Sequence, residues 1–549
     1  MLDYPEISRI LGKYLSIFCF FLLVPIGAAL YFEKLVDPQI HPQPHSLQAF
    51  LWTLLINVSL ALLFSFLGKN GSKQLARRES IFLVVSIWIM TALVSACPFY
   101  LSRTLTNPID AYFEAMSGLT TTGSTMICPK AYHPETAAEI SLYYTNPHVP
   151  TSTYSFQGTV PPIRDPATGL VLYSGVEAVS KAILLWRSFL QWLGGMGIVL
   201  ICLTILPALG VGGKFLYQME STGPIKQGIQ PRVKETASNL WKLYLLFTIV
   251  ETALLFFTNS DMPFFDALCT SFSTISTGGF SVRNENIASY QSVATESIVF
   301  FFMILGSINF ALYFQIFKEP HYPRHAPDFF LFLAILLIGC MAVSSFLIGE
   351  PGSGLGGTDA FYSWKEAFRQ GSFQAVSVQT STGFITANYD RWPFAPQMFM
   401  LLLMFIGGMS GSTAGGIKTS RFYILYKIVL HRLESLYRPD SVRKLKIGTS
   451  EIDDKNALTV LAFFCIVAFF TVIGIICLVL DGIDPETSLG LIACMMNNVG
   501  LAFRAAGPTD SLTFLSNFSK LLSIGWMLLG RLEFYVVLLL FLPSFWKNR

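Results

Sequence analysis

The chain contains few charged residues for its length. Only 13% of its 549 residues are Asp, Glu, Lys or Arg, whereas 52% are hydrophobic. Soluble domains carry about 25% charged residues, so this composition excludes an ordinary soluble protein. Many uninterrupted apolar stretches approach the roughly 20 residues that a helix needs to cross a lipid bilayer. The composition therefore predicts an integral membrane protein.

Cysteine is sparse as well, and its spacing excludes two common roles. The nine cysteines form no C-x-x-C pair, and most of them lie inside apolar stretches. A cysteine in such a place usually behaves as a small hydrophobic side chain. Only Cys128 falls in a long polar segment, where it has no obvious partner. We therefore expect neither a redox centre nor a metal site built from cysteines.

The chain also lacks the short motifs of membrane-embedded enzymes. It contains no G-x-S-x-G, no H-E-x-x-H and no paired aspartates within an apolar span. Residues 411–419 faintly resemble a phosphate-binding loop, but Ile417 separates the glycine from the lysine that this motif places next to each other. We expect no enzymatic activity, no bound nucleotide and no nucleic-acid partner for this chain.

Apolar segments and basic residues together predict the topology. Ten segments can be read as spans, at approximately 14–32, 48–67, 79–101, 179–208, 238–257, 296–317, 327–348, 396–430, 456–480 and 519–543. Lys and Arg gather near both chain ends and in the connecting segments 69–78, 214–234, 318–324 and 421–446. By the positive-inside rule this side is cytoplasmic. A multi-pass protein with both termini in the cytoplasm is expected.

One short polar pattern occurs four times, each time between two apolar spans. The copies are Thr121-Thr122-Gly123, Ser276-Thr277-Gly278, Ser381-Thr382-Gly383 and Asn498-Val499-Gly500. Potassium filters use four such loops to direct backbone carbonyls at a dehydrated cation. Glycine permits the backbone dihedrals that this arrangement needs. The pattern predicts one pore from a single chain, only pseudo-fourfold because the last copy differs most.

The four strips divide the chain into repeats. The predicted fold is all-α integral membrane, with four pseudo-symmetric helix–pore-loop–helix repeats around one pore, preceded by two extra transmembrane helices. The expected boundaries are 1–70 for an N-terminal two-helix hairpin, then 71–210, 211–320, 321–440 and 441–549 for the repeats. Residues 127–177 separate the first strip from its following helix and predict an extracellular insertion in repeat one.

A stretch of mixed polarity precedes each strip and predicts a short pore helix. Three of these stretches begin near a proline and a carboxylate, which are signals of a helix start; the pairs are Pro108 with Asp110, Pro263 with Asp266, and Pro485 with Glu486. The third stretch is less clean and contains Glu366 and Arg369. The C-terminal ends of such helices carry partial negative charge, which favours a cation where four of them converge.

Three further motifs carry a family resemblance: the glycine-rich segment 407–418, the stretch 191–198 and the stretch 530–533. With the two extra N-terminal spans, they resemble the TrkH type of the Trk/Ktr/HKT potassium transporters, from about residue 10 to residue 545. This resemblance implies gated, channel-like potassium uptake across the bacterial inner membrane, with glycine at every filter position. It also implies a homodimer and a cytosolic TrkA-like nucleotide-binding ring that regulates opening and carries the nucleotide.

Two features predict a gate beneath the filter. Residues 407–416 are too rich in glycine and serine for an ordinary helix, because each interior glycine costs about 1 kcal/mol relative to alanine. Arg531 lies in the middle of the last apolar span, where a charge suggests function, and the resemblance places it in the pore. The alternatives are a small-residue packing face and a buried ion pair. The expected gate comprises Gly407, Gly408, Gly411, Ser412, Thr413, Gly415, Gly416, Lys418 and Arg531.

A coupled K⁺/H⁺ or K⁺/Na⁺ symporter is the alternative function. In this interpretation no acid lies plainly in the middle of a span as a proton relay, which counts modestly against coupling to H⁺. The basic cytoplasmic loops at 210–237 and 431–455 suit either anionic lipid or docking of the regulatory ring.

Overall fold

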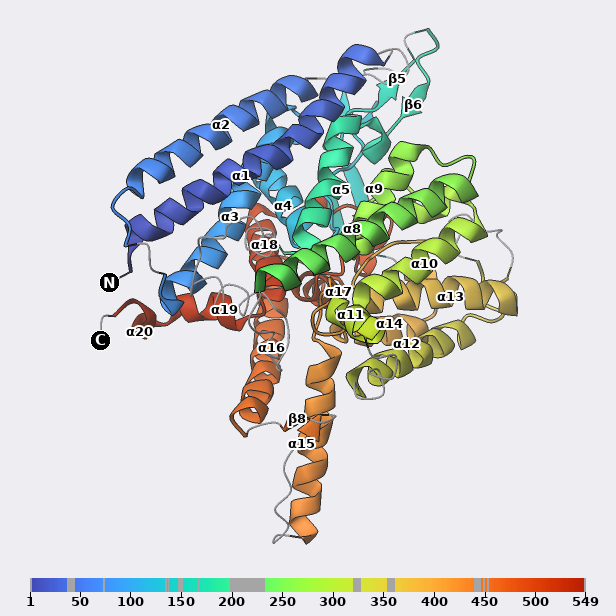
Figure 1. Cartoon of the computed structure of the whole chain (residues 1–549). Coiled ribbons are helices and arrows are strands. Elements are labelled where there is room, and N and C mark those ends of the chain that lie inside the picture. The colour runs from blue at the N-terminus through green and yellow to red at the C-terminus, as the bar shows by residue number, and fades with distance from the viewer. Residues whose placement is uncertain are drawn as a thin grey trace.

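The protein folds almost entirely into helices, as its computed structural model shows (Figure 1). The structure describes residues 2–36, 45–72, 75–133, 136, 138–146, 152–165, 167–197, 233–318, 327–352, 361–438, 446–447, 450–451 and 454–547. The expected all-α class is confirmed. Most of the basic segments 210–237 and 431–455 lies outside the described residues.

Two helices precede four units of similar design. They are α1 (Tyr4–Leu30), which continues into a π-helical turn (Tyr31–Leu35), and α2 (Ser46–Leu67). Each unit then has a long first helix, a short pore helix and a second helix. In chain order these helices are α3 (Arg77–Leu101), α4 (Pro108–Leu119) and α5 (Lys181–Gly195); α8 (Val233–Thr258), α9 (Phe264–Ile275), α10 (Val293–Ser307) and α11 (Phe310–Lys318); α12 (Pro327–Ser345), α13 (Trp364–Gln379), α14 (Phe394–Phe405) and α15 (Thr419–Tyr437); α16 (Asp454–Leu480), α17 (Pro485–Asn497), α18 (Asn517–Arg531), α19 (Tyr535–Leu538) and α20 (Pro543–Trp546).

The second helices are interrupted more often than expected. Six described helices are long and apolar enough to cross a membrane, or eight if two bent pairs each count as one span. In these pairs α10 meets α11 at 89° and α18 meets α19 at 113°. The expectation of continuous spans at 296–317 and 519–543 is therefore wrong. Both bends follow a glycine motif, Gly306-Ser307 or Gly530-Arg531, because glycine and serine weaken a helix and allow it to break.

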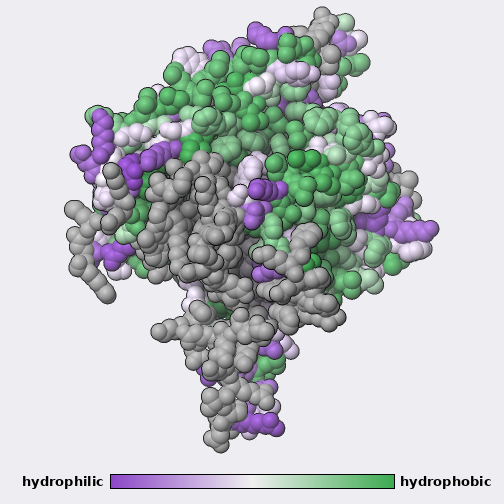
Figure 2. Space-filling model, viewed as in Figure 1, coloured by the Kyte–Doolittle hydropathy of each residue, from purple (hydrophilic) through white to green (hydrophobic). Residues whose placement is uncertain are grey.

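A large apolar surface surrounds the molecule. Many side chains of α1 and α2 are about half exposed or more although they are hydrophobic, including Phe20, Leu23, Leu55, Leu62 and Phe66. Figure 2 shows such residues as a broad green area over the upper part of this face. Exposed apolar patches of this size are rare on soluble monomers. The surface is that of a membrane protein in contact with lipid chains.

Three of the four pore helices begin with a side-chain cap, whereas the second, α9, begins after Pro263 without one. Asn107 accepts a hydrogen bond from the backbone of Ile109 at the start of α4, and Asp484 accepts one from Thr487 at the start of α17. Ser363 and Glu366 form a capping box at the start of α13, which explains why this pore helix needs no proline. Each pore helix ends just before its polar strip, so the strips lie where the four helices stop.

The described residues between 127 and 177 form three small hairpins on one side of the strips, which we call the mouth side. The antiparallel strand pairs are β1 (Ala131–Tyr132) with β2 (Glu139–Ile140), β3 (Leu142–Thr145) with β4 (Thr153–Phe156), and β5 (Ile163–Arg164) with β6 (Val171–Tyr173). A fourth pair, β7 (Lys446–Ile447) with β8 (Ser450–Glu451), lies between α15 and α16. Both termini lie at the end of the molecule away from β5 and β6 (Figure 1).

The mouth-side hairpins are held by two other repeats. The hydroxyl of Tyr154 donates to Asp484 at 2.7 Å, at the start of the fourth pore helix. Burial raises the pKa of Asp484, but hydrogen bonds from Thr487, Tyr154 and Asn146 outweigh burial and hold this pKa below its usual value. Asn284, which follows the second strip, donates to the backbone oxygen of Ser174 at 2.9 Å. The insertion is thus joined to the second and fourth repeats.

Candidate pore and gate

The four polar strips share one backbone conformation. In each strip one residue that is not glycine has a positive φ, between 53° and 56°. These residues are Thr121, Thr277, Ser381 and Asn498. Two positions later comes a glycine with φ between 77° and 94°; these glycines are Gly123, Gly279, Gly383 and Gly500. A left-handed conformation is uncommon outside glycine. Its recurrence at the same place in four strips therefore defines their register.

This register corrects the alignment of the second strip. Sequence comparison equated Gly278 with the other filter glycines, but Gly279 has the matching φ. Hydrogen bonds agree, because the residue before each filter glycine donates its N–H to the carbonyl five residues earlier; the pairs are Thr122 to Ser117, Gly278 to Ser273, Thr382 to Ser377, and Val499 to Cys494. Ser276-Thr277-Gly278 is therefore one residue too early, and the equivalent residues are Thr277-Gly278-Gly279.

The filter glycines interlock around the pore axis. A Cβ atom added to Gly123 would lie less than 3.0 Å from the Gly278 carbonyl oxygen. Cβ atoms in proteins essentially never come so close to another heavy atom. The same overlap links Gly279 to the carbonyl of Thr382, Gly383 to that of Val499, and Gly500 to that of Thr122. Each strip therefore touches the next, and the fourth touches the first. This closed ring requires glycine at all four positions.

Hydroxyl groups behind the strips stabilise this ring. Thr122 and Thr120 share a hydrogen bond of 2.8 Å between their hydroxyls, and Thr382 and Thr380 do the same at the same distance. These four side chains are fully buried. Thr122 and Thr382, which sequence analysis assigned to the filter, therefore direct their hydroxyls to buried protein groups. Carbonyl oxygens are left as the groups that can meet a cation.

A buried ion pair supports the first strip from the mouth side. The guanidinium of Arg187 on α5 donates to Glu114 on α4 at 2.7 Å, and both side chains are at most 2% exposed. Glu114 also accepts the backbone N–H of Met126 at 2.8 Å, while Arg187 lies 4.1 Å from the centre of the Phe280 ring. The pair therefore connects two pore-lining segments of different repeats.

Removal of the Glu114 carboxylate is expected to destabilise the protein. In Glu114→Ala the buried guanidinium of Arg187 loses its counter-charge, which typically costs about 3–5 kcal/mol. Thermal unfolding in detergent should shift strongly downward. The matched control is Glu139→Ala, which breaks the exposed pair of Glu139 with Lys130 and should cost about 1 kcal/mol or less. Equal shifts in the two variants would contradict a structural role for the buried pair.

The glycine-rich segment 407–416 is a loop directly beneath the strips. Its ends are fixed to each other, since the N–H of Gly407 donates to the Ile417 carbonyl at 3.1 Å. Its centre contacts other repeats: the Thr413 hydroxyl donates to the carbonyls of Ile275 and Gly306 at 3.0 Å, and the Gly415 N–H donates to the Ser381 hydroxyl at 2.5 Å. The loop is therefore packed against the second and third strips.

Arg531 completes this layer from the fourth repeat. Its guanidinium donates to the carbonyl of Thr413 at 2.9 Å, to the hydroxyl of Thr121 at 3.1 Å and to the carbonyl of Gly194 at 2.5 Å. One side chain thus joins the loop, the first strip and the end of α5. The structure thus brings together the loop and Arg531, the two parts of the predicted gate. The ammonium of Lys418 donates instead to the Ala414 carbonyl within the loop.

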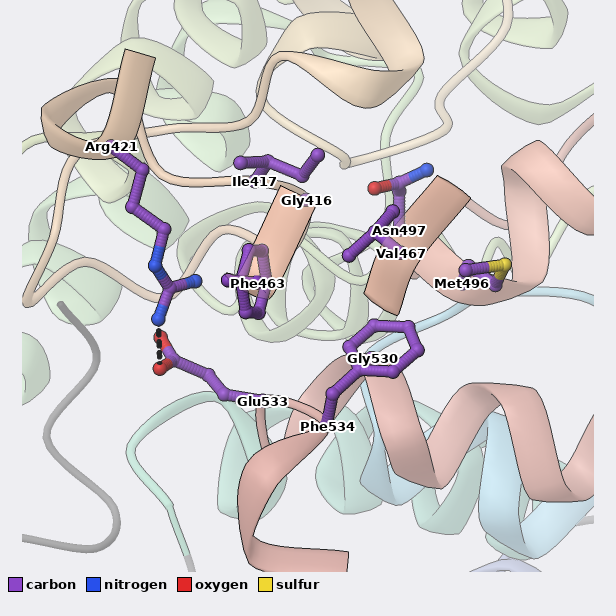
Figure 3. Close-up of a pocket in the computed structure, with 10 residues that line it drawn as sticks. All are labelled: Gly416, Ile417, Arg421, Phe463, Val467, Met496, Asn497, Gly530, Glu533 and Phe534. Atoms are coloured by element: carbon purple, nitrogen blue, oxygen red, sulfur yellow. Dashed lines mark hydrogen bonds and ion pairs between the residues drawn. The ribbon is translucent and has the colours of Figure 1, made fainter. Parts of the chain in front are cut away.

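Glu533, two residues after Arg531, pairs with Arg421 and not with its neighbour. The Arg421 guanidinium lies 2.5 Å from the Glu533 carboxylate and stacks over the Phe463 ring at 3.8 Å. Figure 3 shows this pair at one side of a pocket beneath the loop, with Phe534 next to Glu533 and Met496 on the far side. The backbone turns sharply here, because Glu533 and Phe534 both have positive φ. The pair links the start of α15 to the bend after Arg531.

Sequence analysis missed two residues near the strips. Glu251 on α8 is completely buried, and neither of its carboxylate oxygens has a hydrogen-bond partner among the described residues. Thr274, at the end of the second pore helix, is its neighbour. The expectation that no acid lies plainly in the middle of a span overlooked Glu251, which the sequence shows inside the apolar segment 238–257. Gln191 on α5 is the second residue, and it contacts the second strip directly.

Four re-entrant strips that close a carbonyl ring above a loop, within lipid-facing helices, define a single-chain pore for cations. The family described as "TrkH: Cation transport protein" matches residues 165–548. The chain belongs to this family, which is one of transporters and not of enzymes.

Relatives and a solved structure agree with this assignment. The chain is 31% identical to the Trk system potassium uptake protein TrkH of Halomonas elongata, with 99% of both chains covered. It is 29% identical to the protein of the same name from Escherichia coli K12, with both chains fully covered. The crystal structure of the potassium transporter TrkH from Vibrio parahaemolyticus superposes with a TM-score of 0.78 at 28% identity, over 99% of this chain and 100% of that one. The predicted repeat architecture is thereby confirmed.

Proposed function

We propose that this protein is a gated, channel-like potassium uptake protein of a bacterial inner membrane, with both termini in the cytoplasm. The observation that carries the proposal is the closed ring of Gly123, Gly279, Gly383 and Gly500. Backbone carbonyls in such a ring replace the hydration shell of a cation. The names of the relatives, which are potassium uptake proteins, support K⁺ as the permeant ion.

In this proposal the loop 407–416 and Arg531 form the gate. The loop fills the space under the strips, and Arg531 adds a positive charge next to Thr121. A fixed positive charge in a low-dielectric pore repels K⁺. Opening then requires both the loop and Arg531 to leave the axis.

Ion flux in liposomes made from the pure protein tests the function. We expect uptake of K⁺ or Rb⁺ down its electrochemical gradient, with little uptake of Na⁺ and no requirement for another ion. Empty liposomes and liposomes with heat-unfolded protein are the controls. Absence of cation flux under a strong inside-negative potential, in protein shown to be folded, would contradict the proposal.

Glu251 favours a second candidate, K⁺/H⁺ symport. A buried carboxylate without a described hydrogen-bond partner in the membrane interior is costly as an anion. Such a group beside the second pore helix is the candidate coupling site. We therefore expect a clear difference between the two functions when Glu251 is replaced by an amide that cannot release a proton.

For a symporter, a pH gradient alone should drive K⁺ accumulation in the parent protein but not in Glu251→Gln. For a channel, neither protein should accumulate K⁺ under a pH gradient when the membrane potential is clamped, and both should pass K⁺ down its own gradient. The measurement is the K⁺ content of liposomes with a buffered internal pH. Valinomycin is left out, because it would carry K⁺ itself. Accumulation by the parent that is abolished in Glu251→Gln would establish coupling and contradict the channel proposal.

We further propose a homodimer that binds a cytosolic TrkA-like nucleotide-binding ring through the basic loops at 210–237 and 431–455. Charge reversal at Arg443, Lys444 and Lys446 should weaken co-purification with such a ring and reduce nucleotide control of flux, because surface charges steer and hold partners. Reversal of Lys69, a basic residue of another connecting segment, is the control. Full retention of the complex by the triple variant would exclude this cluster as a docking determinant and favour lipid contact.

A further inference from the structure

The second strip differs from the other three at one position. Its residue before the filter glycine is Gly278, whereas the equivalent residues are Thr122, Thr382 and Val499. Gly278 does not have the positive φ that would demand glycine, unlike Gly279 beside it. A β-branched side chain is therefore compatible with the backbone at this position. Something other than backbone conformation explains why a side chain is missing there.

The side chain of Gln191 occupies the missing space. A Cβ atom added to Gly278 would overlap with the Gln191 side chain, lying 2.6 Å from its Oε1 atom and 2.8 Å from Nε2. Gln191 also holds the strip on both sides of Gly279: its Nε2 donates to the Gly278 carbonyl at 2.6 Å, and its Oε1 accepts the Phe280 N–H at 3.1 Å. Gln191 is fully buried, so these bonds are shielded from water.

Gln191 lies on α5 of the first repeat, two residues before Leu193-Gly194. The matching motifs of the other second helices are Leu305-Gly306, Ile406-Gly407 and Leu529-Gly530, and the residues two positions before them are Met303, Met404 and Met527. All three methionines are at most 1% exposed. The four repeats thus contain three methionines and one glutamine at the same buried position.

The second helices that carry these methionines also lie beside the strip of the next repeat, as α5 does. The side-chain amide of Asn498 donates to the Met527 carbonyl and to the Thr122 hydroxyl, each at 3.0 Å. The fourth second helix therefore lies beside the first strip, as α5 lies beside the second strip. The second helix of each repeat is thus paired with the strip of the next repeat. The pairs with methionine are Met527 with Thr122, Met303 with Thr382 and Met404 with Val499. The remaining pair is Gln191 with Gly278. Glutamine occurs where the strip has glycine.

We propose that Gln191 sets the cation selectivity of the second strip, as a positioning residue that replaces the absent side chain at residue 278. Two consecutive glycines would otherwise leave the Gly278 carbonyl free to rotate, because glycine adds conformational freedom. The amide fixes this carbonyl at the level where the carbonyls of Thr122, Thr382 and Val499 meet the neighbouring glycines. In the size-fit account of filter selectivity, a fixed carbonyl discriminates ions better than a mobile one. This inference rests on the proposed cation permeation.

Four proteins in liposomes test the inference through the ratio of Na⁺ to K⁺ flux: the parent, Gln191→Met, Gly278→Thr and the double variant. Gln191→Met keeps the volume and removes both hydrogen bonds. Its Na⁺/K⁺ flux ratio should rise about fivefold, the factor that a net hydrogen bond of about 1 kcal/mol corresponds to. Gly278→Thr alone should lose most K⁺ flux, because its Cβ overlaps with Gln191.

The double variant is the decisive measurement. Gln191→Met with Gly278→Thr gives the second strip the same pair as the other repeats, so K⁺ flux and selectivity should return toward those of the parent. A role in folding alone predicts no such recovery of the flux ratio. Met303→Leu, at the equivalent position without a hydrogen bond, is the control and should keep the parental ratio.

Two outcomes would overturn the inference. One is an unchanged Na⁺/K⁺ ratio in folded Gln191→Met. The other is a double variant whose ratio is no closer to that of the parent than the ratio of Gln191→Met. Both outcomes leave K⁺ flux of the parent intact, whereas failure of the proposed function would appear as absence of flux in the parent itself.

Discussion

Replacement of any one filter glycine by alanine is expected to abolish K⁺ flux. In Gly123→Ala, Gly279→Ala, Gly383→Ala and Gly500→Ala, the new Cβ atom overlaps with a carbonyl oxygen of the next strip. That neighbour is backbone and cannot turn away as a side chain can. A left-handed conformation adds about 1–2 kcal/mol for a residue with a Cβ atom. A loss of roughly 100-fold in flux, which corresponds to about 2.7 kcal/mol, is a conservative expectation.

The control for these variants separates steric overlap from backbone strain. Gly169 lies in the mouth-side insertion with φ of 69°, and a Cβ atom there would meet nothing within 4 Å. Gly169→Ala therefore carries similar strain without overlap and should keep parental flux. K⁺ and Na⁺ uptake into liposomes are the measurements, with size-exclusion profiles as the check of folding. Parental flux and selectivity in Gly279→Ala would contradict the register assigned to the second strip.

Loss of the proposed gate is expected to have the opposite effect, a large rise in basal flux. Arg531→Ala removes a positive charge and the hydrogen bonds that hold Thr413, Thr121 and Gly194 together. Deletion of residues 411–416 removes the loop itself. Both changes open the space beneath the strips, and basal K⁺ efflux without any partner protein should rise at least about tenfold, or about 1.4 kcal/mol.

Arg531→Lys distinguishes the two parts of this barrier. Lysine keeps the charge but has no planar fork of donors. Basal K⁺ efflux through Arg531→Lys should therefore be lower than through Arg531→Ala and higher than through the parent. K⁺ efflux from preloaded liposomes is the measurement, and the filter should remain selective for K⁺ over Na⁺ in all three variants. Basal efflux equal to that of the parent in both Arg531→Ala and the deletion would place the barrier elsewhere.

The pore helices and strips could be predicted because their signals are local. Asn107 and Pro108, or Ser363 and Glu366, specify a helix start within a few residues. The register of the second strip could not be read from glycine alone, since Gly278 and Gly279 are adjacent. Alignment on the following aromatic residue, Phe280 with Phe384, would have given the correct answer. Sequence patterns locate an element more reliably than its register.

The features that could not be predicted from the sequence depend on the direction in which the chain runs and on contacts between residues far apart in the sequence. Hydropathy gives the same value for a straight span and for the chain that turns by 113° after Arg531. The partner of Glu533 is Arg421, which is 112 positions away. Gln191 belongs to a motif that already suggested the family, but its contact with Gly278 follows only from the rotation that relates the repeats.

The ring of strips has a consequence for biosynthesis. Gly500 of the last repeat rests on the carbonyl of Thr122 in the first, so the ring closes only when residues near the C-terminal end have been synthesised and inserted. Membrane insertion of a growing chain proceeds from the N-terminus. A half-made chain therefore has no complete filter and no Arg531 to hold the loop. The first strip stays without its neighbour from the fourth repeat until the last part of the chain is in the membrane.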